Sequence, residues 1–100
     1  MAYTGKELRS TATEDGRLTL TLEDVTLDAP GADEVIVRVE AAPINPSDLG
    51  LLLGPADVSS LEQQGEGLSF AIPPGRLGGV KARLGQSLPV GNEGAGTVVA

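Results

Sequence analysis

Two segments with apolar side chains at every second position constrain the fold more than any other feature of the chain. They lie at residues 17–27 and 34–42, and because successive side chains of a strand point to opposite faces, they predict strands. A turn sequence at residues 28–31 separates them, so we expect the two strands to pair as a hairpin. The alternating residues are Leu18, Leu20 and Leu22 in the first segment and Val35, Val37 and Val39 in the second.

A helix is expected shortly after the second strand, over residues 46–53. Asn45 is a good N-cap residue, Pro46 suits the first helical turn, and Gly54 followed by proline predicts the end of the helix. Residues 57–64 are expected to form another short helical turn.

The remaining segments carry weaker signals. We expect a first strand at residues 3–9 and a last strand at residues 97–100. Residues 65–87 are rich in glycine and proline and contain few apolar side chains, which predicts an irregular excursion.

A length of 100 residues predicts one small domain at most, and its core is expected to be aliphatic, because only Tyr3 and Phe70 are aromatic. A formal net charge of −7 disfavours nucleic acid and anionic membranes as partners. The chain has no apolar run of membrane-spanning length and no signal segment, so we expect a cytoplasmic protein. Cysteine and histidine are absent, which removes disulfides and the commonest zinc ligands, and no metal site is expected.

Residues 42–49, at the junction of a predicted strand and helix, form the first candidate site. Such junctions present backbone N–H groups and short polar side chains to a cleft. The Asn45 amide can donate and accept hydrogen bonds, and the Ser47 hydroxyl can relay a proton. From the residues alone a structural role is favoured, in which Asn45 caps the helix, Pro46 begins it, and Ser47 and Asp48 bind free helix N–H groups.

The second candidate is the glycine-rich run at residues 91–96. Its spacing is G-x-x-G-x-G before a strand, whereas the dinucleotide fingerprint is G-x-G-x-x-G and opens a helix, so we expect no phosphate-binding loop. The glycines predict a tight backbone turn into a buried strand, with Glu93 needing a hydrogen-bonded partner if it is buried.

In this order, three segments resemble the medium-chain dehydrogenase/reductase family. Residues 31–39 are similar to the segment that opens its GroES-like catalytic domain. Residues 43–48, Pro-Ile-Asn-Pro-Ser-Asp, are similar to its active-site segment, and residues 91–99 to its Gly-x-Glu-Gly-x-Gly-x-Val segment. The resemblance implies a mostly β fold class, a GroES-like partial barrel over residues 1–100, with an irregular insertion at about residues 55–87. It also implies a parent enzyme with an α/β Rossmann domain beyond residue 100, and we expect a truncated chain because it ends within a predicted strand.

The residue types at two positions select a branch of this family. Its zinc alcohol dehydrogenases carry a cysteine ligand at the position of Asn45 and a histidine ligand at that of Asn92, and amides are poor zinc ligands. The resemblance therefore implies a zinc-independent, NAD(P)H-dependent oxidoreductase, with NADPH favoured over NADH, that transfers hydride to a quinone or an α,β-unsaturated carbonyl. It implies catalytic roles for Ser47 and Asn45, cofactor contacts from Asn45 and Pro46, a structural Glu93, and a homodimeric parent enzyme.

Two alternatives stay open. The two motif segments are especially like those of trans-2-enoyl-thioester reductases, but these carry a catalytic tyrosine soon after the helix, and the only tyrosine here is Tyr3. GroES-like domains also occur as non-catalytic scaffolds, so the chain could be a binding module. The stretch between Gly54 and Leu88 is longer than the family norm, and we expect it to lie near the substrate and to alter specificity.

Overall fold

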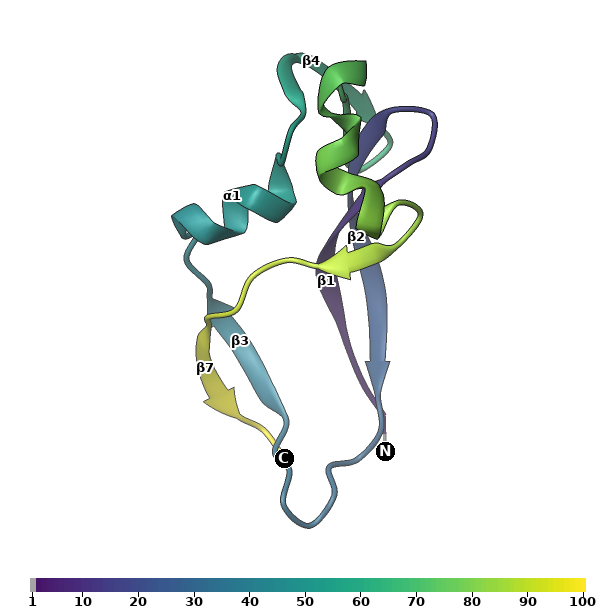
Figure 1. The fold of residues 1–100 in the computed structure, drawn as a ribbon. Helices are drawn as coiled ribbons and strands as arrows, with labels where there is room; N and C mark the ends of the chain where they lie inside the picture. The colour runs from purple at the N-terminus through teal and green to yellow at the C-terminus, as the bar shows by residue number, and fades with distance from the viewer. Residues whose placement is uncertain (1) are drawn as a thin grey trace.

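The computed structural model describes residues 2–100, and the fold is mostly β. The strands are β1 (Tyr3–Ala12), β2 (Arg17–Leu27), β3 (Val37–Ala41), β4 (Asp57–Gln64), β5 (Gly67–Ala71), β6 (Ser87–Pro89) and β7 (Ala95–Val98), and the helices are α1 (Pro46–Leu52) and the 3₁₀ helix η1 (Pro74–Arg83). Five strands form an antiparallel sheet in the order β4-β5-β2-β1-β6, and β3 and β7 form a second antiparallel sheet (Figure 1). Across residues 2–100, neither sheet closes into a barrel.

The strand predicted at residues 17–27 is confirmed as β2, but its predicted partner is wrong. β2 pairs with β1 on one edge, where Leu22 lies opposite Leu8, and with β5 on the other, while β3 pairs with β7. The turn at residues 13–16 is the shorter connection, and the Thr13 N–H donates to the Arg17 carbonyl at 2.8 Å to close it. A short turn between two long strands favours a local hairpin over pairing across the longer 28–36 connection.

The core lies where β1, β2 and β5 meet the two helices. Leu18 of β2 lies opposite Phe70 of β5, and both are buried. Burial of such side chains contributes roughly 1.5–3 kcal/mol each. The core is therefore small and mainly aliphatic, with Phe70 as its one aromatic residue among those described. Its members are Ala12, Leu18, Leu20, Leu52, Ala56, Phe70, Ile72 and Val80.

Two predictions for the segment after α1 are wrong. Residues 57–64 form strand β4 in place of a helical turn, and residues 65–87 contain β5, η1 and β6 in place of an irregular excursion. Three of the buried core side chains come from this stretch, including Phe70 at 5% exposure. Some of its glycines and prolines separate the elements, as at the β4–β5 turn, where Gly65 has φ +59°, while others, such as Gly78 and Gly79, lie inside η1. The expected insertion at 55–87 thus supplies β4, β5 and the start of β6 to the main sheet, together with the helix η1.

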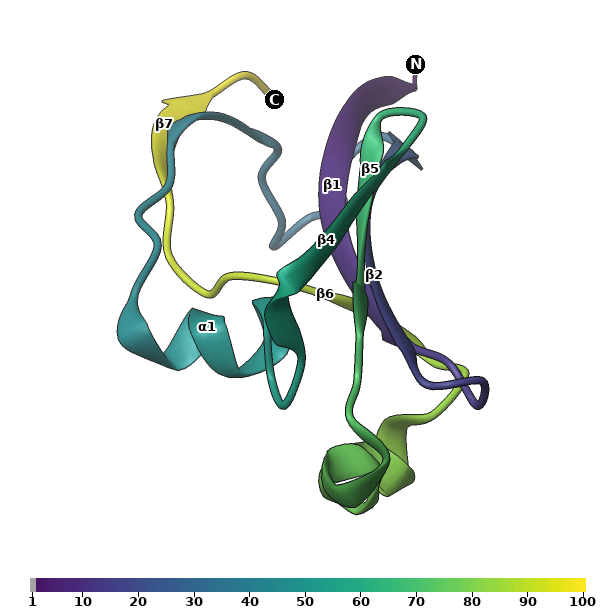
Figure 2. The ribbon, with the colours of Figure 1, turned by 90° about the horizontal axis from the view of Figure 1, so that it is seen from above.

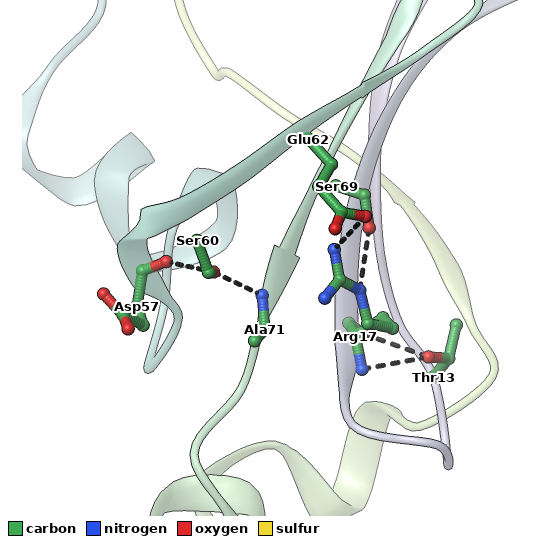
Figure 3. A network of polar contacts seen from close by, with 7 residues as sticks. All are labelled: Thr13, Arg17, Asp57, Ser60, Glu62, Ser69 and Ala71. Atoms are coloured by element: carbon green, nitrogen blue, oxygen red, sulfur yellow. Dashed lines mark hydrogen bonds and ion pairs between the residues drawn. The ribbon is translucent and has the colours of Figure 1, made fainter.

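Polar contacts attach the β4–β5 hairpin to its neighbours (Figure 3). Arg17 of β2 donates from Nε to the Ser69 hydroxyl at 3.0 Å and from Nη2 to the Glu62 carboxylate at 3.3 Å. The β4–β5 register shifts between Asp57 and Glu62, and there the Ser60 hydroxyl accepts the Ala71 N–H at 2.7 Å. The serine therefore replaces a backbone partner that the bulge removes.

The two-stranded sheet stands to one side of the main sheet in both views (Figures 1 and 2). Every residue of β3 and β7 is exposed, so the buried strand predicted after the glycine-rich run is wrong. The radius of gyration is 15.7 Å, compared with about 13 Å for a compact domain of this length. The strand predicted at residues 34–42 is shorter, and that predicted at residues 97–100 begins two residues earlier, at Ala95.

Candidate functional site

Pairing of β3 with β7 brings the two motif segments together. Ala41 lies opposite Ala95, so residues 42–48 and residues 91–94 lie side by side at one end of the small sheet. Between them is a hollow of about 530 Å³, called the motif cleft here. Its lining residues are Ala42, Pro43, Ile44, Asp48 and Leu52 from the first segment and α1, Val90, Gly91, Asn92, Glu93 and Gly94 from the second, and Lys6, Glu7, Leu8 and Val39 from the strands.

The start of α1 is built by local hydrogen bonds. Asn45 is the N-cap residue in an extended conformation (φ −90°, ψ 158°), and Pro46 is the first helical residue, which confirms the predicted helix start. The Asn45 N–H donates to the Asp48 carboxylate at 2.8 Å, and the Asp48 N–H donates to the Asn45 carbonyl at 2.9 Å. Asp48 is only 7% exposed, so this carboxylate serves the helix start as well as the cleft wall.

The three site residues predicted from the sequence lie beside the motif cleft and do not line it. Asn45 is half-buried, and Pro46 and Ser47 are exposed in the first turn of α1. The residues immediately before and after them, Ile44 and Asp48, form the wall. The structure therefore places the predicted residues at the edge of the cleft.

Asn92 and Glu93 are exposed and face the same region from the other segment. They also line a second, more open hollow against Ala41, Ala42 and Pro43. Glu93 needs no buried partner, because it is not buried. From the sequence, Asn92 was identified only as standing at the position of a zinc ligand in related enzymes, and Asp48 only as a residue of the helix start. Their shared cleft could not be found without the β3–β7 pairing.

The motif cleft combines an apolar wall with a few polar groups. Asp48, Asn92 and Glu93 supply carboxylate and amide oxygens, while Lys6 is held at 2.8 Å from Asp24. The hydrogen bond and charge of Asp24 raise the pKa of Lys6, which keeps the ammonium charged. Within residues 2–100, no three Cys, His, Asp or Glu side chains gather as a metal-binding group. An apolar wall with scattered oxygen and nitrogen groups suits a small organic ligand.

The glycine-rich run has an architectural requirement at one position. A Cβ atom on Gly96 would clash with the Arg38 carbonyl oxygen, far inside van der Waals contact. Glycine at this position therefore allows β7 to approach β3.

A separate hollow of about 620 Å³ lies between the five-stranded sheet and β3. Tyr3 lines this hollow, together with Val25, Leu27, Val37 and Val99, and does not line the motif cleft. Strand β1 pairs with β6 only at residues 9–11, and β3 pairs with β7 alone, so each strand keeps an unpaired edge within residues 2–100.

None of the helices within residues 2–100 has the length and apolar character needed to cross a membrane. A comparison of the chain with protein-family models and with curated proteins found no match to either.

Proposed function

We propose that this chain is the N-terminal part of a zinc-independent, NAD(P)H-dependent oxidoreductase of the quinone oxidoreductase type, within the medium-chain dehydrogenase/reductase family. The supporting observation is the adjacency of residues 42–48 and 91–94 around one cleft. They belong to two of the three segments that resemble that family, and they are far apart in the sequence. The proposed fold of the parent enzyme is a GroES-like partial barrel followed by a Rossmann domain.

The residues around the motif cleft fit a nicotinamide and a carbonyl or quinone substrate. Pro43 and Ile44 offer an apolar surface, and the half-buried Asn45 amide offers both a donor and an acceptor. The nicotinamide, NADPH in preference to NADH, supplies the hydride when it is bound. From their place at the edge of the cleft, Asn45 and Pro46 would contact the cofactor, and the Ser47 hydroxyl would donate a hydrogen bond to the substrate oxygen that is reduced.

A second candidate is a non-catalytic binding module, which is favoured by the apolar hollow beside β3 and the exposed valines there. Val37 and Val39 are 43% and 62% exposed. The trans-2-enoyl-thioester reductase alternative receives less support, because Tyr3 lies in that hollow and not beside α1. Contiguous exposed apolar surface is typical of interaction sites.

The experiment is a reductase assay on the full-length parent protein after chelator treatment. NADPH or NADH is supplied with 1,4-benzoquinone or with a simple cyclic enone, and loss of the reduced nicotinamide is followed by absorbance. Substrate-dependent oxidation that survives chelation supports the proposal. Alcohol oxidation that requires added zinc contradicts it, and nucleotide-independent binding of another protein without turnover favours the module.

A further inference from the structure

A buried hydrogen-bond relay joins three elements at the C-terminal end of α1. Ser10 of β1 has no exposed surface, and its hydroxyl donates to the Leu51 carbonyl in α1 at 2.6 Å. The Arg83 guanidinium at the end of η1 donates from Nη2 to the same hydroxyl oxygen at 2.8 Å. The serine is thus the link between the arginine and the helix.

Arg83 is a half-buried cation that is not paired with a carboxylate among the described residues. Its Nε is buried and has no hydrogen-bond partner among the described atoms, and none of the ion pairs within residues 2–100 includes it. Burial lowers the pKa of the guanidinium below its usual range. A partly desolvated cation needs a compensating polar interaction.

The C-terminal end of α1 supplies that interaction. The last turn of a helix leaves carbonyl groups with partial negative charge, and α1 has no basic residue in its last turn. Arg83 provides the missing cation through Ser10. The end of η1 is itself fixed to β1, because the Gly85 N–H donates to the Ala12 carbonyl at 2.8 Å. The end of η1 therefore holds the guanidinium in place relative to β1, and Ser10 connects the guanidinium to α1.

We propose that Arg83 is a positioning residue that acts through Ser10 to fix the direction of α1, and with it the placement of Asn45 and Ser47 at the other end of the helix. The catalytic meaning of this placement rests on the proposed oxidoreductase function, whereas the structural relay does not. The proposal gives a role to the long segment after α1. Through Arg83, this segment positions the helix that carries the site, and Arg83 itself does not contact the substrate.

The test compares Arg83→Met, Arg83→Lys and Ser10→Ala with Arg76→Met in the full chain. Arg76 is a matched control on η1, since it is exposed and reaches only the Pro55 carbonyl at 3.5 Å. Amide exchange of Leu53, whose N–H donates to Leu49 at the end of α1, is measured against that of Leu20 in β2. NMR signals of the Asn45 side-chain amide and the Ser47 backbone report the other end of the helix.

Arg83→Met and Ser10→Ala are expected to accelerate Leu53 exchange by roughly tenfold, the effect of one lost hydrogen bond, with Leu20 unchanged. Both variants should shift the Asn45 and Ser47 signals, and combining them should add little, because they act on one relay. Arg83→Lys, which keeps a donor and the charge, should restore part of the protection. If Arg83→Met matches Arg76→Met in exchange and in the Asn45 signal, the proposal is wrong.

Turnover of the parent enzyme separates this proposal from the proposed function. Arg83→Met should lower kcat on the order of tenfold while KM for the nucleotide changes little, because orientation and not binding is lost. If the unsubstituted protein has measurable reductase activity and Arg83→Met has the same kcat, the positioning role is wrong. Exchange and signal changes in a protein without any reductase activity would support the relay and contradict the oxidoreductase.

Discussion

Ala41 of β3 lies opposite Ala95 of β7, and each alanine is the immediate chain neighbour of one of the two motif segments that face each other across the cleft. This single register connects parts of the chain that are more than forty positions apart in the sequence. A shift of one residue would turn the side chains of β3 to the opposite face of the small sheet. The composition of the motif cleft thus depends on a strand pairing outside the main core.

Under the proposed oxidoreductase function, Asn45→Ala and Ser47→Ala are expected to lower turnover by on the order of 10²-fold, because hydrogen-bond or proton-transfer assistance to the reduced oxygen would be lost. Asn45→Ala should change the free energy of unfolding little, because the hydrogen bonds at the helix start use the Asn45 backbone and the Asp48 carboxylate, which the substitution keeps. Exposed Ser47 should show little change in stability. Steady-state kinetics and urea unfolding are measured on each variant. Early unfolding with near-native turnover in both would leave only the capping role.

Two glycine substitutions should change stability in opposite directions. A Cβ at Gly96 meets the Arg38 carbonyl, so Gly96→Ala should destabilise the β3–β7 pairing by about 1–3 kcal/mol through overpacking. Gly50 lies within α1, and a Cβ added there would meet nothing within 4 Å, so Gly50→Ala should stabilise the helix by about 0.5–1 kcal/mol. Thermal and urea unfolding of both variants provide the comparison. If neither substitution changes the free energy of unfolding, β7 does not approach β3 as closely as described.

Phe70→Ala should lower the free energy of unfolding by about 3–5 kcal/mol, because a buried aromatic ring is replaced by a cavity. Leu68, on the same strand and 37% exposed, is the control, and Leu68→Ala should have a smaller effect. Amide exchange should show β5 protected to a similar degree as β2, with which it pairs. Rapid exchange throughout β5, with a mild effect of Phe70→Ala, would instead favour the irregular segment that the glycines and prolines predict.

The sequence predicted the elements whose determinants are local. α1 follows from Asn45 and Pro46 at its start and from Gly54, which has φ +48° shortly after its end. β2 follows from its alternating leucines, although the apolar face extends past the core and leaves Leu22 48% exposed. In both cases the deciding residues lie within the element or close to it.

The errors concern contacts made at a distance. Alternation cannot say which strand is the partner, and the choice of β1 over β3 for β2 depended on the shorter turn at residues 13–16. Glycine and proline hid β5 and η1, because they occur at the ends of elements and even inside η1, as Gly78 and Gly79 do, as well as in loops. β4 contains neither residue and was predicted as a helical turn, because its pairing with β5 is not visible in its own residues. The cleft positions of Asp48 and Asn92 likewise required the β3–β7 register.

The Lys6–Asp24 pair predicts a small, salt-sensitive contribution to acid stability. The hydrogen bond and charge of Lys6 hold the pKa of Asp24 below its ordinary value of 3.8. A lowered carboxylate pKa contributes stability that is present above 3.8 and is lost as the pH falls through the lower, folded-state value. NMR titration should find the Asp24 midpoint below 3.8 and return it toward that value in Lys6→Met or in high salt. An unchanged midpoint in Lys6→Met would show that the pair does not form in solution.

The unpaired edge of β3 sets a limit on how freely its sequence can change. An exposed strand edge is a template for pairing with another chain, and the apolar Val37 and Val39 strengthen that tendency. Arg38 and Glu40 place charges between and beside the valines, and such gatekeeper residues oppose aggregation. Replacing Arg38 or Glu40 by an uncharged residue would therefore lower the highest concentration at which the protein remains free of aggregates. This effect would come before any change in the fold or in the chemistry of the cleft.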